Sequence, residues 1–590
     1  MFLPTTKKEM EKLGWDRLDV VLVSGDSYID SPYVGVAVIG KVLLEAGFRV
    51  GVIGQPDISN DDVMRLGIPQ LFWGVSAGCI DSMVANRTAS GKKRNRDDYT
   101  PGGRNDRRPD RATIAYTNLI RRYSREEPKP VVLGGIEASL RRVAHYDCWT
   151  DSVRRSVLFD AKADFLLYGM CERSVVELAR CLKDGKDASI VRGLCYISKT
   201  LPEGSIELPS FEEAAADKDA FTRAFQLFYN NNDPATASRL AQGHADRYLV
   251  QNPPAFYLEQ KDFDAVYNIK YERDLHPFHK KDGEVKALET IRFSISTHRG
   301  CYGECGFCAI AVHEGRRVRS RSSESIIAEA RQIARHPLFK GRIHDVGGPS
   351  ANMYATTCTR MEKSGCCMKK SCISPKVCPL MKFGHDEQIS LLKAVRSIEG
   401  VKKAIVASGI RHDLVLADRK DGERYLKELV AHHVSGQMKI APEHTETSVL
   451  DQMGKPGCTP EALVKFKELF YKFTGEAGLK QFLSYYLMAA HPGCTAADMK
   501  KLKSFVTREL GSIPEQVQVF TPTPSTFSTL VYWTGRDPFT GRPVFVEKSA
   551  KGREEQKAIL CGYEKEGRHP APKPHWQKKQ HLKGRGAKKY

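Results

Sequence analysis

The sequence predicts an α/β protein in which a doubly wound sheet domain precedes a partial barrel of six β/α repeats. Two observations lead to this prediction: strand and helix patterns alternate through the first 200 residues, and the alternation resumes at residue 291 and runs to residue 520. Strands that alternate with helices usually pair in parallel and are covered by those helices. We therefore expect two main domains, at residues 1–200 and 286–560.

The first domain contains apolar strand patterns that are separated by helical segments. Residues 18–24 (LDVVLVS) predict the first strand, residues 35–46 an apolar helix, and later strands are expected at 48–54, 71–76 and 130–133. Gly134-Gly135 and the YGMCE segment at 168–172 follow the ends of predicted strands. Ligands of open α/β sheets bind beyond the carboxyl ends of the strands. We therefore expect these loops to face a ligand crevice.

Residues 201–285 interrupt the alternation, and we expect a connector there with a helix at 211–230. The second domain begins with a strand at 291–297. Five more strands, alternating with helices, are expected at 342–346, 403–408, 437–441, 481–488 and 516–520. Six repeats cannot close as a barrel of eight strands does, so the sequence predicts an open partial barrel.

A cysteine motif, Cys301-x₃-Cys305-x₂-Cys308, follows the first strand of the second domain. Cysteine thiolates hold iron–sulfur clusters, and three ligands leave one iron of a four-iron cluster open, as catalytic metal sites require. A zinc knuckle would use four ligands in two pairs, and bacterial ferredoxins space their thiols differently. A disulfide cluster would need an oxidising compartment. A catalytic iron–sulfur cluster is therefore the favoured interpretation.

The motif, with the aromatic Phe307 before its last cysteine, resembles the signature of the radical S-adenosylmethionine (SAM) superfamily. The resemblance implies a 4Fe–4S cluster on Cys301, Cys305 and Cys308 whose open iron chelates SAM. One electron passed to the sulfonium would yield a 5′-deoxyadenosyl radical. It also implies a one-electron donor, such as flavodoxin or ferredoxin, as a partner.

Residues after the next barrel strands are candidates for SAM binding. The resemblance assigns the backbone of Gly347-Gly348 to the SAM amino group, but Pro349 stands where an acidic residue would follow. The Ser408-Gly-Ile-Arg411 segment follows the third strand, and Arg411 could bind a carboxylate in bidentate fashion. Glu443 follows the fourth strand. Solvated surface charge is the alternative interpretation of Arg411 and Glu443, and the sequence assigns no catalytic residue.

A second group of cysteines crowds an insertion at residues 358–378, and a possible ligand set is Cys358, Cys367, Cys372 and Cys378. Four thiols in a reducing compartment suit zinc or a second iron–sulfur cluster. Lysines lie among them and favour thiolates. The alternative is a loop of free thiols.

The layout of residues 1–200 resembles the cobalamin-binding-type domain that precedes many radical SAM cores. In that family a histidine ligand of cobalt would follow Asp26 by two residues, but Tyr28 stands there and the loop contains no histidine. This difference argues against cobalamin as a cofactor. Binding of cobalamin without a protein base is the alternative that the sequence leaves open.

Further motifs along nearly the whole chain resemble the YgiQ-type radical SAM family. They are YTPGG (99–103), RPDRAT (108–113), VLGGIEASLRR (132–142), HYD (145–147), THRGC (297–301), GGPSAN (347–352), APEH (441–444) and HPG (491–493). The resemblance implies the cluster and SAM as a co-substrate. It does not supply a reaction or a substrate.

The chain carries a net charge of +20, which is concentrated locally. Residues 567–590 have eight basic and no acidic side chains, and residues 86–111 have nine basic and four acidic ones. Such blocks favour polyanions such as RNA, although a solvated loop and a disordered tail at 561–590 are the commoner outcome. A radical SAM enzyme acting on an unknown substrate, with RNA weakly favoured, is therefore our first hypothesis, and a non-catalytic iron–sulfur or zinc protein that binds RNA is the alternative.

The composition excludes several other classes of protein. The sequence contains no run of about 18 apolar residues, so no membrane span is expected. The first residues lack the basic-then-apolar layout of a signal peptide. We therefore expect a cytoplasmic protein. Its sixteen cysteines would then be metal ligands or free thiols rather than disulfides.

Overall fold

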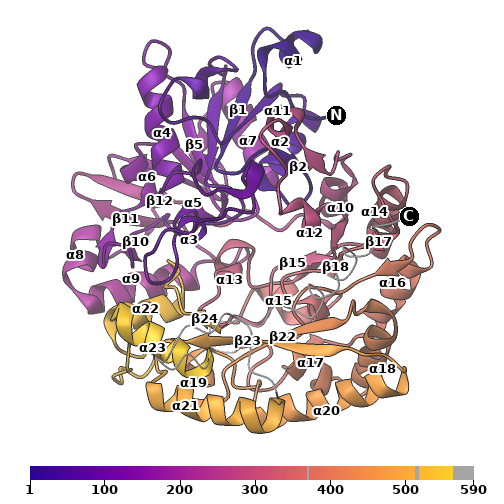
Figure 1. Ribbon diagram of the computed structural model, residues 1–590. Helices are drawn as coiled ribbons and strands as arrows, with labels where there is room; N and C mark the ends of the chain where they lie inside the picture. The colour runs from indigo at the N-terminus through magenta and orange to yellow at the C-terminus, as the bar shows by residue number, and fades with distance from the viewer. Residues whose placement is uncertain (368–370, 512–516, 562–590) are drawn as a thin grey trace, which may run out of the picture.

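The computed structural model describes residues 1–367, 371–511 and 517–561. Two α/β halves stack on one another, with the N-terminal domain above the C-terminal barrel in the view of Figure 1. The predicted basic tail at 567–590 lies outside the described residues. No helix in the described part of the chain is long and apolar enough to cross a membrane.

The N-terminal domain is built on five parallel strands in the order β3–β1–β4–β5–β8. They are β3 (Val50–Gly54), β1 (Val20–Ser24), β4 (Phe72–Ser76), β5 (Val131–Gly134) and β8 (Phe165–Leu167). The four predicted strands are confirmed. The order reverses between β1 and β4, and such a switch point is where open α/β sheets bind ligands.

Alternate residues of these strands enter two different hydrophobic layers. Val20 and Leu22 of β1 pack with α2 (Gly35–Glu45) and α7 (Glu172–Lys183) on one face of the sheet. Val21 and Val23 pack on the other face with α4 (Ala112–Tyr123). Every residue of β1 is buried, which explains its continuous apolar sequence, because a doubly covered parallel strand has no solvated side.

The sheet continues beyond residue 200, which differs from the predicted connector. Four strands extend it: β9 (Leu194–Ser198), β12 (Arg247–Gln251), β11 (Leu240–His244) and β10 (Ile206–Leu208). β9 is antiparallel to β8, and β12 is antiparallel to both β9 and β11, so the sheet is mixed. The helix expected at 211–230 is confirmed as α8 (Phe211–Ala216) and α9 (Lys218–Asn230), which are separated by the N-cap residue Asp217. The added strands are short and contain many polar residues, so their sequences give only a weak strand pattern.

The six barrel strands follow one another in chain order, as predicted. They are β14 (Ser294–Ser296), β18 (Asp345–Gly347), β21 (Lys403–Ala404), β22 (Gln437–Glu443), β23 (Phe482–Ala489) and β24 (Val517–Val519). Parallel pairing joins β14 to β18 and β22–β23–β24, while β17 (Arg342–Ile343) pairs with β21 and Ile410 bridges to Ile440. The first strand starts later than predicted, because Leu288–Ile291 forms helix α12.

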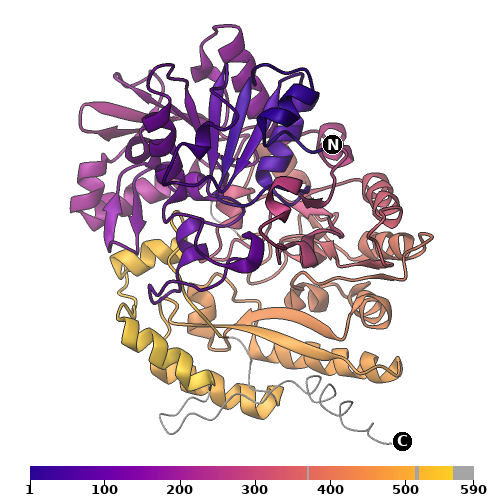
Figure 2. The ribbon, with the colours of Figure 1, turned by 45° about the horizontal axis from the view of Figure 1, so that its top comes forward.

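Helices cover the outer face of the barrel (Figure 2). They are α14 (Ser323–Ala334), α16 (Asp386–Arg396), α18 (Gly422–Glu428), α20 (Pro460–Glu476) and α21 (Ala496–Phe505). Their inner positions are apolar and buried, as Leu463, Phe466 and Phe470 of α20 show. The loops at the carboxyl ends of the strands therefore remain free to form a site.

The two halves meet at the carboxyl ends of their strands. A short antiparallel pair joins β2 (Ile29–Asp30), which follows β1, to β13 (Asp274–Leu275) ahead of the barrel. Arg299, two residues before Cys301, forms a 2.5 Å ion pair with Glu172 at the start of α7. The cysteine motif is thereby tied to the loop that follows β8.

A buried ion-pair cluster occupies the loop after β1, where the sequence lacked a histidine. The Arg108 guanidinium lies 2.6 Å from Asp26 and 3.0 Å from Asp97, and all three side chains are nearly inaccessible. Burial raises the pKa of Asp26, although Arg108 opposes this shift. A Cβ on Gly78 would lie 2.3 Å from the Asp26 carboxylate, so only glycine allows this close packing. The loop after β1 thus presents a carboxylate, and not an imidazole, at the switch point.

Much of the basic charge in residues 86–111 is paired with acidic side chains, mostly at the surface. Arg87 pairs with Asp110, Arg104 with Asp106, and Arg107 with Asp282, in addition to the buried Arg108. The predicted preference of this loop for RNA was based on its total charge. The charge free to attract a polyanion is smaller than that total.

We expect Arg108→Met to lower the free energy of unfolding by about 3–5 kcal/mol, because it leaves two carboxylates buried without their cation. Arg87→Met is the matched control, since its ion pair with Asp110 is more than one-third exposed and should be worth about 1 kcal/mol or less. Thermal denaturation of both variants measures the difference. Equal melting temperatures for the two variants would contradict a structural role for the buried cluster.

Candidate cluster and cofactor site

The cysteine motif forms a tight loop between β15 (His298–Arg299) and β16 (Arg319–Ser320). The Gly303 N–H donates to Cys301 Sγ at 3.3 Å, and a Cβ on Gly303 would lie 3.2 Å from Cys301 Sγ and 3.6 Å from Cys305 Sγ. Burial raises the pKa of the Cys301 thiol. Gly303 therefore lies against the sulfur atoms of both Cys301 and Cys305, on the loop that also carries Cys308.

Arg411 places a positive charge beside this loop. Its Nη1 lies 3.8 Å from Cys305 Sγ and its Nη2 lies 3.6 Å from Cys458 Sγ. The sequence predicted a ligand carboxylate for Arg411, but in the structure its guanidinium is paired within the chain with Asp413, which accepts from Nε at 3.0 Å and from Nη2 at 2.5 Å. Because Arg411 is buried and bidentately paired, it is not a solvated surface charge. Its position suits stabilisation of a thiolate on Cys305.

Asn352 fixes the backbone of Arg411 in this position. The Arg411 N–H donates to Asn352 Oδ1 at 2.9 Å, and Asn352 Nδ2 donates back to the Arg411 carbonyl at 3.0 Å. Asn352 is 2 % exposed. The GGPSAN motif thus contributes both the predicted glycine turn and the residue that holds Arg411.

Glu443, at the end of β22, pairs with a lysine that the sequence analysis did not identify. Lys455 Nζ lies 3.6 Å from Glu443 Oε1 and also donates to the Ala441 carbonyl. Burial raises the pKa of Glu443, although Lys455 opposes the shift. Glu443 has a φ of +67°, a conformation that costs energy for a residue with a Cβ. Lys455 and Cys458 follow α19 (Thr447–Gln452) in a KPGC segment, which is the signal that could have revealed them.

Gly347, Gly348 and Ser408 form a separate, closely packed group at the ends of β18 and β21. A Cβ on Gly347 would lie 2.5 Å from Ser408 Oγ, and one on Gly348 would lie 2.5–2.8 Å from the ring of His298. Asp345 accepts from the backbone N–H groups of Ala407 and Ser408 at 2.8 and 3.1 Å. Glycine is therefore required at both positions, which agrees with a turn whose backbone contacts a ligand.

A cavity of about 500 Å³ lies between the two halves. The barrel contributes Ser296, His298, Asp345, Gly347, Gly348 and Ser408, while the N-terminal domain contributes its strand-end loops, including Gly134-Gly135 and Gly169–Glu172. The predicted loops therefore line a cavity, and ligand binding in it stays a prediction. The predicted residues thus divide into two groups: Gly347, Gly348 and Ser408 line the cavity, and Arg411 and Glu443 belong to the charged network beside Cys305. Their binding roles remain predictions.

The second group of cysteines packs beside the motif. Cys358, Cys366 and Cys372 are buried in one hydrophobic cluster with Tyr302, and Cys301 and Cys378 lie at its edge. Within the described ranges, no three of these sulfurs lie within 4.8 Å of one another, as the ligands of a single zinc ion would. His412, Asp413 and Cys458 do meet this criterion, but Arg411 already donates to Asp413 and Cys458. The metal predicted for the insertion stays a prediction.

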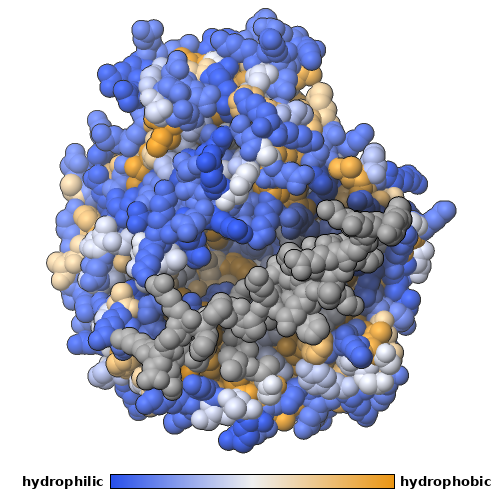
Figure 3. Space-filling view, viewed as in Figure 1, coloured by the Kyte–Doolittle hydropathy of each residue, from blue (hydrophilic) through white to orange (hydrophobic). Residues whose placement is uncertain are grey.

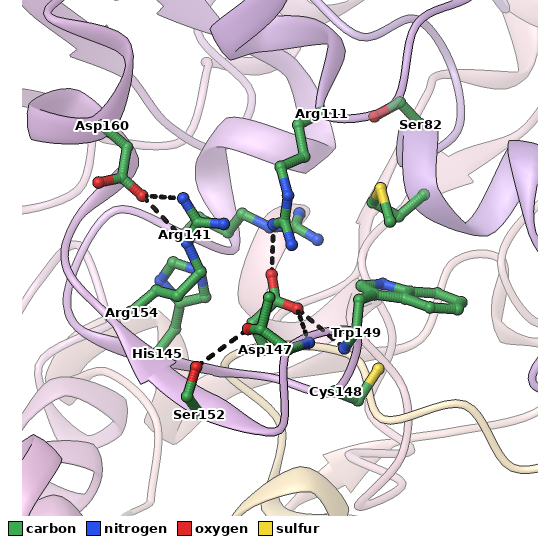
Figure 4. Close-up of polar contacts among 12 residues, drawn as sticks. Ser82, Arg111, Arg141, His145, Asp147, Cys148, Trp149, Ser152, Arg154 and Asp160 are labelled. Carbon is green, nitrogen blue, oxygen red and sulfur yellow. Dashed lines mark hydrogen bonds and ion pairs between the residues drawn. The ribbon is translucent and has the colours of Figure 1, made fainter. Parts of the chain in front are cut away.

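Arginine and aspartate side chains of several N-terminal motifs form an internal network (Figure 4), whereas Gly134-Gly135 of the VLGGIEASLRR motif lines the cavity. Arg111 donates to Asp147, which also accepts from the backbone N–H groups of Trp149 and Thr150 at 2.9 and 3.2 Å. Arg141 donates to Asp81 in the same way. Burial would raise the pKa of Asp147, but Arg111 outweighs it, and this pKa is lowered to about 2. The RPDRAT, VLGGIEASLRR and HYD motifs therefore stabilise the fold.

Comparison with known proteins identifies the class of the chain. The family described as Radical SAM N-terminal matches residues 2–294. This match, together with the partial barrel and the cysteine loop, defines a radical SAM protein.

The chain belongs to the UPF0313 family, which confirms the YgiQ-type resemblance. It is 53 % identical over 560 residues to a UPF0313 protein of Fusobacterium nucleatum, covering 95 % of this chain and 98 % of the relative. It is 48 % identical over 572 residues to a UPF0313 protein of Thermotoga petrophila, covering 96 % of this chain and 100 % of the relative.

Solved structures are similar only at the level of the overall chain path. The radical SAM methyltransferase TsrM from Kitasatospora setae, solved with tryptophan and a SAM analogue bound, has a TM-score of 0.48 at 15 % identity over 86 % of this chain and 74 % of that chain. The cobalamin-dependent radical enzyme OxsB, solved with aqua-cobalamin, has a TM-score of 0.48 at 13 % identity, covering 90 % and 57 %. Similarity this distant supports no residue-by-residue comparison.

We expect Gly348→Ala to weaken SAM binding by at least about tenfold, or about 1.4 kcal/mol, because the new methyl group would displace the ring of His298 and move the turn. Gly475→Ala is the control, since its Cβ would meet nothing within 4 Å. Equilibrium dialysis of SAM against reconstituted protein measures both affinities. If both variants bound SAM like the unmodified protein, the Gly347-Gly348 turn would not be part of the SAM site.

Proposed function

We propose that the protein is a radical SAM enzyme that reductively cleaves SAM at a 4Fe–4S cluster held by Cys301, Cys305 and Cys308. The observation that carries this proposal is the folded three-thiol loop at the carboxyl end of the first barrel strand, with Arg411 beside Cys305. When bound, the cluster and SAM supply a 5′-deoxyadenosyl radical from one electron and one SAM molecule, with methionine as the other product. The donor set fits, because three thiols leave one iron open to SAM.

Charged residues of the chain surround the cysteine loop and are held in place by their own partners. The charge of Arg411 is compensated by Asp413, and its backbone is fixed by Asn352. Its guanidinium is therefore held in one position beside Cys305. Charge-assisted contacts of this kind favour the ionised form of a thiol. Lys455 and Glu443 add a second, buried pair nearby. This network is expected to place compensated positive charge beside Cys305 in a site away from water.

SAM is proposed to lie at the polar, barrel side of the cavity. There the backbone of Gly347-Gly348 is open to a ligand, and Asp345 and Ser408 support the turn through hydrogen bonds. The N-terminal domain covers this side of the barrel, held by Arg299 and Glu172. Exclusion of water protects a reactive radical from side reactions. A flavodoxin- or ferredoxin-type protein is the proposed electron donor.

Cobalamin ligated by a histidine is not part of this proposal. TsrM and OxsB are described with cobalamin bound. In this chain the loop after β1 presents Asp26, which is already paired with Arg108. The residues of this loop do not fit an imidazole-ligated cobalt. The proposal therefore requires only the cluster and SAM.

We expect replacement of Cys301, Cys305 and Cys308 by Ala to remove the motif's cluster and reduce SAM cleavage to background, because each position supplies one ligand. Protein reconstituted anaerobically and given dithionite and SAM is assayed for methionine and 5′-deoxyadenosine, and its visible absorption reports the cluster. The control replaces Cys181, Cys195 and Cys561, which lie outside both cysteine groups, and should retain cleavage.

Undiminished cleavage in the triple variant would refute the proposed ligand set. If the unmodified protein carried a cluster and bound RNA but released neither product, the non-catalytic alternative would hold.

We also expect the triple variant to retain iron or zinc, because the insertion offers its own thiols at Cys358, Cys367, Cys372 and Cys378. Metal analysis of anaerobically purified protein tests this prediction, and replacing these four cysteines by Ser should remove the remaining metal. Absence of both metals from the triple variant would show that the insertion is a loop of free thiols.

A further inference from the structure

The cavity between the two halves has an apolar branch that the proposed function does not use. This branch runs from the barrel side into the space between the sheet and two of its covering helices. We call it the slot; its walls are Leu22, Phe72, Val132 and Leu167 of the sheet, Val34, Val36 and Val38 at the start of α2, and Val175 of α7. In Figure 3 the outer surface is mostly hydrophilic, and apolar residues appear in the hollow between the two halves.

Open space at this place is unusual for an α/β domain. The same side chains belong to the hydrophobic core that joins the sheet to α2 and α7, and protein cores are normally packed without voids larger than a water molecule. Gly35 at the start of α2 is exposed and lines the cavity, and a Cβ there would meet nothing within 4 Å, so the cavity is open at this end of the helix. Ligand pockets are typically concave and lined mainly by apolar side chains with a few polar groups, as this cavity is.

The charges around the cavity indicate what kind of ligand it accepts. Four carboxylates line it, those of Asp26, Glu172, Glu314 and Asp345. Arg299 is the single arginine or lysine among the described lining residues, and it is already paired with Glu172.

The two imidazoles of the lining add no positive charge at neutral pH. Burial lowers the pKa of His298 to about 4 and that of His313 to about 4. The start of α2 offers only about half a positive charge. A phosphate or sulfonate in this cavity would therefore lack a cationic partner.

One acceptor atom of the lining is available for a hydrogen bond from a ligand. Glu172 Oε2 is buried and has no hydrogen-bond partner among the residues that the structure describes, although Oε1 accepts from Arg299. Glu172 is 4 % exposed and lines the cavity. A buried acceptor of this kind is costly unless a ligand or water donates to it.

We propose that the substrate is an uncharged or cationic organic molecule that places an apolar part in the slot and donates a hydrogen bond at Glu172. This inference rests on the proposed function, since it identifies the second ligand beside SAM in the same cavity. The RNA that the sequence weakly favoured does not fit the cavity, because its phosphates would find no unpaired arginine or lysine among the described lining residues.

Two fluorescent probes that differ by one sulfonate test the proposal. N-phenyl-1-naphthylamine is uncharged, and 1-anilinonaphthalene-8-sulfonate is its anionic counterpart. The full-length protein should bind the uncharged probe at one saturable site and the anionic probe at least about tenfold more weakly. SAM, added to the reconstituted protein, should not displace the uncharged probe.

A slot-filling variant and a matched control locate the probe. Gly35→Phe should weaken binding of the uncharged probe by at least about tenfold. Gly475→Phe should leave it unchanged, because Gly475 is likewise a helical glycine with open space around its Cβ but lies outside the cavity. Circular dichroism of both variants verifies that they are folded.

Three results would overturn the proposal: equal affinity for the two probes, no effect of Gly35→Phe in the folded protein, or displacement of the probe by SAM. The binding measurements need no SAM cleavage. A protein that binds the uncharged probe in the slot but does not cleave SAM would therefore refute the proposed function and leave the slot assignment standing.

Discussion

The contact between Arg299 and Glu172 is the interaction on which the arrangement of the site depends. Arg299 lies two residues before the first cysteine of the motif, and Glu172 begins the helix after β8. Their 2.5 Å ion pair is nearly buried, and the Arg299 Nε–H also donates to the Tyr267 hydroxyl at 2.8 Å. Such a pair is stabilising only when geometry and additional hydrogen bonds offset desolvation. The Tyr267 contact supplies one such bond, while Glu172 Oε2 has no hydrogen-bond partner among the described residues. The pair fixes the cysteine loop against the strand ends of the N-terminal domain.

With the two halves fixed in this way, one cavity is shared by both sets of strand ends. Parallel β/α units place their functional loops at the carboxyl ends of their strands, and stacking two such units with these ends facing encloses the space between them. The barrel side of the cavity is polar and carries the glycine turn, while the sheet side is apolar and extends into the core. A single enclosure therefore offers two chemically different environments close to the cysteine motif.

The charges near the cluster loop are balanced within the protein. Arg411 is matched by Asp413 and Lys455 by Glu443, so neither cation depends on a substrate for its partner. Buried cations without partners are costly, and pairing allows both to remain beside Cys305 and Cys458. The consequence for function is that this network suits support of the cluster, whereas recognition of the substrate falls to the cavity.

The sequence by itself determined the order of the elements, the class of the protein and the cysteine motif. The strands predicted at 18–24 and 437–441 appear as β1 and β22 because their apolar residues form an unbroken or alternating pattern that a strand alone explains. The Cys301, Cys305 and Cys308 spacing is equally local. A motif of this kind needs no knowledge of distant residues.

Tertiary structure alone decided which distant residues meet. The contacts of Arg411 with Cys305 and Cys458, the contact of Gly348 with His298, and the addition of β10, β11 and β12 to the sheet all depend on packing between segments that are far apart in the chain. The slot is the clearest case, because its walls are ordinary apolar core residues whose sequence is that of a filled core. The space between them depends on how far apart the sheet and α2 lie, and this distance follows from the packing of the whole domain and not from any local pattern.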